Sequence, residues 1–257
     1  MNIERYLPAE RLLPFIKTFL LIESKEGMTN RILPGTSLVM AFNYKGEVSH
    51  GEGETRSRLP TSTITGLRKS PRLLTYSEET ATLLVLFKEG GASAFFRTPL
   101  QELFGRSLSL NQLMAAYPVK AVEEQLAEAH CNQQRIAIVE RFLLAQLKIP
   151  PSDPLVSEAV QRIKLASGNI RIQALLTDLP ISRDPFEKRF RRLIGISPKQ
   201  FATIIRLREV INSPMSAESL TRTAYAVGYF DQAHFSRDFQ SFTGQTPRTF
   251  FQSASYW

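Results

Sequence analysis

A short set of charged and amide side chains occurs twice in the second half of the chain, and its members can read the edges of nucleic-acid bases. On a helix that advances about 100° per residue, most of them point away from a row of phenylalanines. Arginine and lysine can pair with guanine, glutamine with adenine, and glutamate can accept from cytosine. The first set is Arg183, Asp184, Glu187, Lys188 and Arg191, and the second is Gln232, Ala233, Ser236, Arg237 and Gln240.

Each of these side chains also has an explanation that needs no ligand, because a solvated helix face carries similar residues. For Asp184 that explanation is strong, since the helix dipole alone favours an acid in the first turn. Ala233 is small enough to let a helix approach a groove closely or touch a thymine methyl. Both interpretations stay open for every single residue of the two sets.

The elements that would position these side chains form an internal repeat with an offset of 49 residues. Ser182 and Asp231 are suitable N-caps, because their side-chain oxygens can accept from the free amides of a first helical turn. Gly195 and Gly244 follow as helix stops, which predicts recognition helices over about 182–192 and 231–242. The buried stripes expected at i, i+4 and i+7 are Phe186, Phe190 and Leu193, and Phe235, Phe239 and Phe242.

A shorter helical pattern precedes each of these helices, at 172–176 and at 220–226, and a tight connection joins each pair. Two short helices with a sharp turn, the second capped and basic, make a helix-turn-helix. Between the copies, residues 198–212 predict one helix that spans roughly 22 Å. Two reading helices fit successive major grooves when they stand roughly 34 Å apart. One chain with a rigid connector can therefore read two adjacent groove segments.

The chain divides at residues 148–154, where three prolines discourage helix and predict a linker. Before it, β-type runs at 19–22, 37–44 and 81–87 are broken by glycine and proline turns, and helical spacing from 121 to 147 predicts a helical hairpin or a bent helix. The expected fold is α+β with two domains. Residues 1–147 form a small β-sheet or barrel-like domain with C-terminal helices, and residues 155–257 form an all-α double helix-turn-helix domain joined by a linker helix.

The net charge of +8 and the pI near 9.7 favour a polyanionic partner, either nucleic acid or an anionic membrane surface. Residues 151–257 hold 14 basic and 9 acidic side chains, so the excess is concentrated in the shorter, helical half. No apolar run approaches the roughly 18 residues that cross a bilayer. The first residues lack the features of a secretory signal, and we expect a cytoplasmic protein with no membrane partner.

The sequence contains few of the residues and motifs that are typical of enzymes. Its single cysteine, Cys131, excludes an internal disulfide and a cysteine-rich zinc site, and we expect it to be a small, buried or half-buried side chain. His50 with Glu52 and Glu54 can be a metal site, but a polar hairpin tip explains the stretch as well. The common hydrolase, zinc-protease and nucleotide-binding motifs are absent. We therefore expect no catalytic residue, no metal and no cofactor.

The second copy, from Ala224 to Pro247, resembles the signature of the AraC/XylS family of bacterial transcription regulators. The first copy, from Ser182 to Phe201, resembles the upstream helix-turn-helix of the same family. The likeness implies double-stranded DNA and RNA polymerase as partners and a homodimer, and a role as activator or as repressor is compatible with it. It departs from the family at Leu179-Pro180, where a small or glycine-containing turn is usual, and at Phe251, where an arginine often stands. The first departure predicts a weaker contribution from the upstream helix.

The amino-terminal half resembles a group within that family that has a β-rich sensor domain of unclear ligand, in Arg31-Ile-Leu-Pro-Gly35, Gly66 and the stretch 87–92. Residues 55–77 contain no acid but five bases, Arg56, Arg58, Arg68, Lys69 and Arg72. If these converge at a sheet rim they can hold an anionic small-molecule effector, although a solvated loop explains them too. Six phenylalanines can line an apolar pocket or belong to the core: Phe15, Phe19, Phe42, Phe87, Phe95 and Phe96.

Three classes of function follow, of which a sequence-specific DNA-binding regulator fits the residues best. The alternative is a DNA-binding module fused to an enzymatic or purely dimerising amino-terminal domain, the helix at 133–147 being a candidate for pairing with its copy or packing on its own sheet. The third class is a protein that binds nucleic acid or membranes through charge alone. A regulator should prefer its operator by orders of magnitude over random duplex, whereas a charge-only binder should not.

Overall fold

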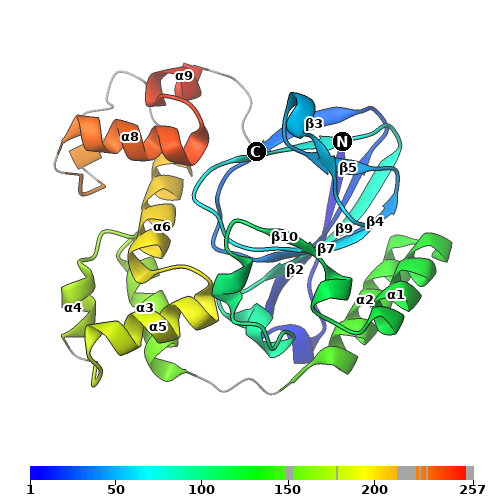
Figure 1. Cartoon of the computed structure of the whole chain (residues 1–257), viewed down its shortest axis with the longest axis horizontal. Coiled ribbons are helices and arrows are strands. Elements are labelled where there is room, and N and C mark those ends of the chain that lie inside the picture. Colours follow the sequence, from blue (N-terminus) through cyan, green and yellow to red (C-terminus); the bar gives the residue numbers. More distant parts are fainter. Residues whose placement is uncertain (149–152, 178, 213–223, 226, 230, 253–257) are drawn as a thin grey trace.

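The computed structural model describes residues 1–148, 153–177, 179–212, 224–225, 227–229 and 231–252. An amino-terminal domain of β-sheets lies beside a carboxy-terminal domain of helices, which is the expected α+β architecture (Figure 1). The strands are β1 Asn2–Tyr6, β2 Ile16–Ser24, β3 Met28–Ile32, β4 Val39–Lys45, β5 Val48–His50, β6 Ser57–Arg58, β7 Ser62–Thr65, β8 Arg72–Tyr76, β9 Thr80–Phe87 and β10 Ser107–Ser109. The helices are α1 Ala116–Glu128, α2 Asn132–Gln146, α3 Pro154–Leu165, α4 Ile172–Leu176, α5 Arg183–Ile194, α6 Pro198–Asn212, α8 Gln232–Thr243 and α9 Pro247–Gln252.

The strands form two antiparallel sheets, one with the order β1-β2-β9-β4-β7-β10 and the other with the order β3-β8-β5-β6. The expected sheet is confirmed, but the sheets are not closed into a barrel, because each keeps two edge strands. β9 pairs with both β2 and β4, and its almost unbroken apolar run suits a strand that is covered on both faces. A closed barrel would need the two edge strands of a sheet to pair with each other, and the length and composition of the chain do not show whether they do.

The core of the amino-terminal domain contains five of the six phenylalanines that the sequence offered as pocket lining. Phe19, Phe42, Phe87, Phe95 and Phe96 are buried, and Phe87 contacts the ring of Phe95 in a tilted arrangement and that of Phe96 edge-on. Only Phe15 is half-buried, where it meets Phe95 edge-on at 5.9 Å. Five of the six therefore belong to the core, which is one of the two alternatives, and Phe15 lines a cavity that α3 also borders.

The helical pattern at 121–147 is a hairpin of α1 and α2, which covers one end of the large sheet (Figure 1). Phe142 of α2 meets Phe42 of β4 edge-on at 6.1 Å, so the apolar stripe of α2 packs on its own sheet. Cys131 lies at the N-cap of α2 and is exposed, contrary to the expectation of a buried or half-buried thiol. It is exposed because the chain turns there between the two helices.

The first carboxy-terminal helix, α3, begins at Pro154, and the Asp153 carboxylate accepts from the Val156 amide as its N-cap. Its buried face is Val156, Ala159, Val160 and Ile163, the face that the sequence predicts. Residues 149–152 of the expected linker lie outside the described residues. So does most of the expected helix at 220–226, of which residues 224–225 are described as helical.

Candidate nucleic-acid interface

A helix, α5, is present where the first candidate recognition helix is expected, with two differences from the prediction. Phe186, Phe190 and Ile194 are its buried residues, whereas Leu193 is half-buried, so the stripe follows i, i+4, i+8. Ser182 occupies the N-cap but its side chain makes no capping hydrogen bond. The helix ends at Gly195 with φ of 98°, a left-handed conformation that favours glycine.

The second candidate helix, α8, follows the prediction closely. Phe235, Phe239 and Phe242 are buried, and the helix ends at Gly244 with φ of 79°. The Asp231 carboxylate accepts from the His234 amide at 2.7 Å, which satisfies one of the free donors of the first turn. The two helices thus share a buried aromatic stripe and a glycine at the carboxy-terminal end, but only α8 has a side-chain hydrogen bond at its N-cap.

This difference predicts unequal effects of removing the two caps. Asp231→Ala is expected to lower the free energy of unfolding by about 0.5–2 kcal/mol, because it deletes a formed capping bond. Ser182→Ala is the matched variant, and it should change stability by less than about 0.5 kcal/mol, because no bond is lost. Urea denaturation followed by far-UV circular dichroism measures both. Equal losses in the two variants would show that the cap geometry does not distinguish the modules.

In α5 the predicted base-reading residues lie on the outer face. Arg183, Asp184, Lys188 and Arg191 are exposed and Glu187 is half-buried. The Glu187 carboxylate lies 3.1 Å from Arg183 Nε and 3.7 Å from Arg191 Nη2. Exposed pairs of this kind contribute only a few tenths of a kcal/mol, so they hold the side chains in place without preventing a new partner.

In α8 the corresponding face is less charged. Gln232, Ala233, Arg237 and Gln240 are exposed and Ser236 is half-buried. Arg237 Nε donates to the Ala233 carbonyl at 3.4 Å, so its side chain lies back along the helix. This face presents one cation, two amides and one methyl group, a set that suits base edges better than phosphates.

The helix α6 connects the two modules, and its observed bounds are those predicted. It lies between α5 and α8 in Figure 1, which places the candidate helices at its opposite ends. Phe201 of α6 meets Phe190 edge-on at 5.7 Å. Ile204, Leu207 and Val210 complete its buried face, whereas Ile211 of the predicted stripe is half-buried. Because buried side chains lie along its length, α6 packs against both modules and fixes the position of α5 relative to α8.

A cluster that the sequence did not reveal fixes α8 against α6. The Arg206 guanidinium lies 4.3 Å from the centre of the Tyr229 ring, and Tyr229 donates to Asp238 at 3.0 Å. Burial is the main cause of the raised pKa of Tyr229, so its hydroxyl stays protonated and remains a donor. The preceding Gly228 has φ of 80°, and a Cβ there would lie 2.2 Å from Asn169 Oδ1. These residues are far apart in sequence, and no spacing signal joins them.

The amino-terminal domain contacts the carboxy-terminal ends of both candidate helices. Gly195, after α5, lies against Leu100, where a Cβ would approach the carbonyl oxygen to 3.2 Å. Arg31 donates to the Thr243 carbonyl of α8 at 3.4 Å. A third contact joins Glu89 to Lys164 of α3 at 3.3 Å. The amino-terminal domain therefore contacts both modules and leaves their predicted reading faces exposed.

The five basic residues at 56–72 do not converge on one rim. Arg56 donates to Ser49 at 2.7 Å, and Arg58 pairs with Glu47 at 2.7 Å on the surface. Lys69 is exposed beside a cleft that α6 and α8 also line. Only Arg68 and Arg72 line the cavity between the two sheets. The expected convergence of the five cations at one rim is therefore wrong, because Arg58 lies in β6, Arg72 in β8, and the other three in connections between strands.

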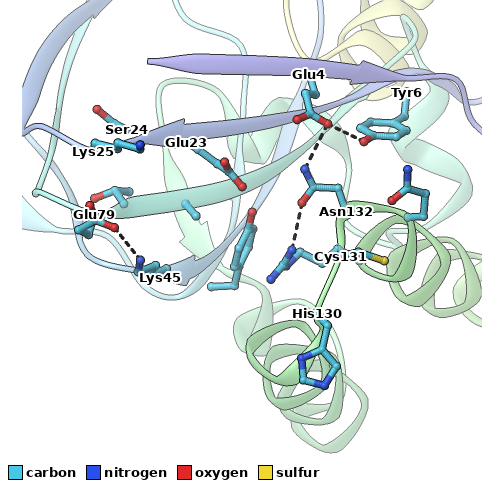
Figure 2. A pocket seen from close by; sticks show the side chains of 15 residues that line it. Glu4, Tyr6, Glu23, Ser24, Lys25, Lys45, Glu79, His130, Cys131 and Asn132 are labelled. Atoms are coloured by element: carbon cyan, nitrogen blue, oxygen red, sulfur yellow. Dashed lines mark hydrogen bonds and ion pairs between the residues drawn. The ribbon is translucent and has the colours of Figure 1, made fainter.

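A second, polar cavity of about 660 Å³ lies where the turn between α1 and α2 meets the large sheet (Figure 2). Glu4 accepts from both Tyr6 and Asn132, and Lys45 pairs with Glu79 at 2.7 Å. Its charged groups are thus largely satisfied by one another. Burial raises the pKa of Tyr44 to about 12, and the Arg135 guanidinium covers its ring at 4.4 Å.

The alternative metal site at His50 lacks support among the described residues. His50 Nε2 lies 2.9 Å from the Ser57 hydroxyl, and the described part of the chain gathers no group of three metal-ligating side chains. The side chain of Glu54 is outside the described part. None of the helices that the structure describes is long and apolar enough to cross a membrane.

Comparison with known protein families gives one match in each half of the chain. A sequence profile described as a helix-turn-helix domain matches residues 175–253, and another, a domain of unknown function (DUF6597), matches residues 4–109. The Msm operon regulatory protein of Streptococcus mutans is 24% identical over 157 residues, 58% of this chain and 55% of that protein. The arabinose operon regulatory protein of Salmonella typhimurium is 29% identical over 194 residues, 68% of this chain and 62% of that protein. The chain thus spans less than two thirds of the length of either relative.

Among solved structures, apo ToxT from Vibrio cholerae strain SCE256 is similar at 13% identity, covering 92% of this chain and 98% of that chain with a TM-score of 0.48. The chain thus combines a β-sheet domain with a helix-turn-helix match and is similar in sequence to two operon regulatory proteins. These matches support the resemblance to the AraC/XylS family, with a β-rich domain ahead of the helix-turn-helix domain.

Proposed function

We propose that this chain is a sequence-specific DNA-binding transcription regulator that places α5 and α8 in adjacent major grooves. The observation that carries the proposal is the pair of exposed faces at opposite ends of α6, each backed by a buried aromatic stripe. Both helices are 12 residues long, long enough to lie in a groove and present three or four side chains to base edges. The proposed domains are those expected from the sequence: a sensor and dimerisation domain at 1–147, a linker at 148–154 and a DNA-binding domain at 155–257.

The amino-terminal domain is proposed to modulate DNA binding in response to a small molecule. Its contacts with Gly195 and with Thr243 lie at the ends of the two reading helices, so a shift of the domain alters their relative position. Because α5 and α8 must meet DNA together, a change of a few ångströms in their separation is enough to weaken binding.

Competition at fixed salt tests the DNA-binding proposal. Fragments bound by the full chain are selected from the source genome, and one is labelled and titrated in the presence of unlabelled random duplex. A regulator is expected to prefer the selected duplex by about 10³-fold or more. A preference of less than about tenfold would instead assign the binding to charge alone.

The two modules are expected to contribute unequally. Lys188→Ala should weaken binding to the selected duplex less than Arg237→Ala does, because Leu179-Pro180 replaces the usual turn ahead of α5. Leu179 is joined to Leu176 and Ile181 by backbone hydrogen bonds of 3.1 and 2.7 Å, a tight local path into the helix. Parallel anisotropy titrations of the two variants measure the difference. A larger loss at Lys188 would refute the unequal assignment.

A further inference from the structure

The space between the two sheets contains a small, partly open cavity of about 170 Å³, called here the intersheet cavity. Apolar side chains from both sheets line most of it, including Ile22, Ala41, Leu74 and Leu84, and the hydroxyls of Thr63 and Thr82 add a few polar points. A cavity of about 150 Å³ with apolar walls is large enough for benzene. The intersheet cavity therefore has room for one ring or a short alkyl chain.

Two arginines enter this otherwise apolar space. Arg72 starts β8 in the smaller sheet and is only 9% exposed. Its guanidinium reaches across to Ser107 of β10 in the larger sheet and donates to that hydroxyl at 2.6 Å. Arg68 is half-buried in the connection between β7 and β8. Among the described residues, the lining of the cavity contains both cations and no aspartate or glutamate.

Burial without a carboxylate is unfavourable for a guanidinium, since a neutral hydroxyl only partly replaces its hydration. The electrostatics agree with this geometry. Burial, and then the charge of Arg68, lower the pKa of the Arg72 guanidinium to about 10. Burial also lowers the pKa of Arg68. Both groups remain cationic at neutral pH, so the cavity holds two positive charges that an anion would compensate.

We propose that the intersheet cavity binds a small organic monoanion, with its apolar body between the sheets and its anionic head on Arg72 and Arg68. The binding site itself stands on the cavity alone. Its consequence for DNA binding rests on the proposed function above. The size of the space restricts the body to about the size of a single ring or a six-carbon chain.

Arg68 connects this site to the helical domain. Its side chain also lines a cleft that Pro34, Gly35 and Arg208 of α6 share. It lines a third cleft together with Lys199 and Thr203 of α6 and with residues of α8. Arg208 in turn donates to the Pro34 carbonyl at 3.1 Å, across the boundary between the domains. An anion that draws Arg68 toward the cavity therefore changes what α6 and α8 meet, which makes Arg68 the coupling residue.

Isothermal titration calorimetry on the full chain tests the site with four probes: benzoate, hexanoate, benzamide and inorganic phosphate. Benzoate or hexanoate is expected to bind at least about tenfold more tightly than benzamide, which matches benzoate in shape but lacks its charge. Phosphate has the charge without the apolar body and should bind more weakly than either carboxylate. Equal binding of benzamide, equal binding of phosphate, or no binding of the carboxylates at 10 mM or so would overturn the site.

Variants of Arg72 assign the binding to this cavity. Arg72→Gln should weaken binding of the better carboxylate by about tenfold or more, and Arg72→Lys, which keeps the charge, should recover part of it. Arg106→Gln is the matched control, since Arg106 is exposed and directly precedes Ser107. Urea denaturation shows whether each variant folds. If folded Arg72→Gln and Arg72→Lys both bind like the unmodified chain, the anion does not lie on Arg72 and the proposal fails.

The coupling role of Arg68 is read from DNA affinity. The bound carboxylate should change the affinity of the unmodified chain and of Arg106→Gln for the selected duplex by about threefold or more, a coupling of the usual size. In Arg68→Gln the change should disappear while calorimetric binding, held by Arg72, persists in weakened form. An undiminished change in Arg68→Gln would refute the coupling. A chain that binds the carboxylate but prefers no duplex would refute the proposed function and leave the site standing.

Discussion

Arg237→Ala is expected to weaken binding to the selected duplex by about 1–3 kcal/mol, the range for loss of a base contact. Arg237 is exposed on α8, and its Nε donates to the Ala233 carbonyl one turn earlier. It is the single cation among the five candidate residues of that helix, so no neighbour on the same face replaces it. Fluorescence anisotropy titrations at one salt concentration measure the change on the selected duplex and on random duplex.

The pattern of loss tells which group Arg237 contacts. A base contact weakens binding to the selected duplex and leaves binding to random duplex almost unchanged. Equal losses on both would assign the side chain to phosphate. Arg97→Ala serves as the control, because Arg97 is an exposed arginine of the amino-terminal domain and its removal changes the net charge equally.

Phe239→Ala should lower the free energy of unfolding of the helical domain by about 3–5 kcal/mol, the range for deleting a buried aromatic ring. Phe239 is 0% exposed and lies at the centre of an aromatic group. Its ring meets Phe235 at 5.6 Å, Phe250 at 5.2 Å and Phe251 at 5.7 Å. Removing the ring leaves a cavity between α8 and α9. The packing that orients the reading face of α8 is then lost.

Urea denaturation followed by circular dichroism at 222 nm measures this loss. Tyr117→Ala is the control, since Tyr117 is an aromatic residue of α1 that is 83% exposed and should change stability by less than about 0.5 kcal/mol. A loss below about 1 kcal/mol in Phe239→Ala would mean that the aromatic group does not hold α8. The sequence repeat would then have a different physical origin.

The sequence predicts the helical domain well because each signal there is local. The glycine stops, the Asp231 cap and the phenylalanine spacing all act within one helix, and the bounds of α6 match their prediction. The failures are at single contacts. Ser182 has the composition of a cap without forming the bond, and Ile194 takes the buried place expected for Leu193 because the helix follows i+8 there rather than i+7.

The amino-terminal domain was predictable only in its longest strands and its helical hairpin. Short strands such as β6, with two residues, carry no periodicity that a sequence can show. The pairing of β10 with β7 joins Ser107 to Thr65, and only this pairing brings Ser107 within reach of Arg72. Composition revealed the basic stretch at 56–72, but which two of its five cations enter the cavity depends on long-range register.

The central claim, that α5 and α8 read adjacent grooves as one rigid unit, is tested most directly by changing the spacing within the selected duplex. Inserting about 5 bp between the segment that α5 contacts and the segment that α8 contacts turns one of them to the opposite face of the DNA duplex. Because α6 packs against both modules, we expect the affinity to fall close to the level of random duplex. An unchanged affinity after this insertion would contradict the claim, since it would show that only one helix reads sequence or that the two modules move independently.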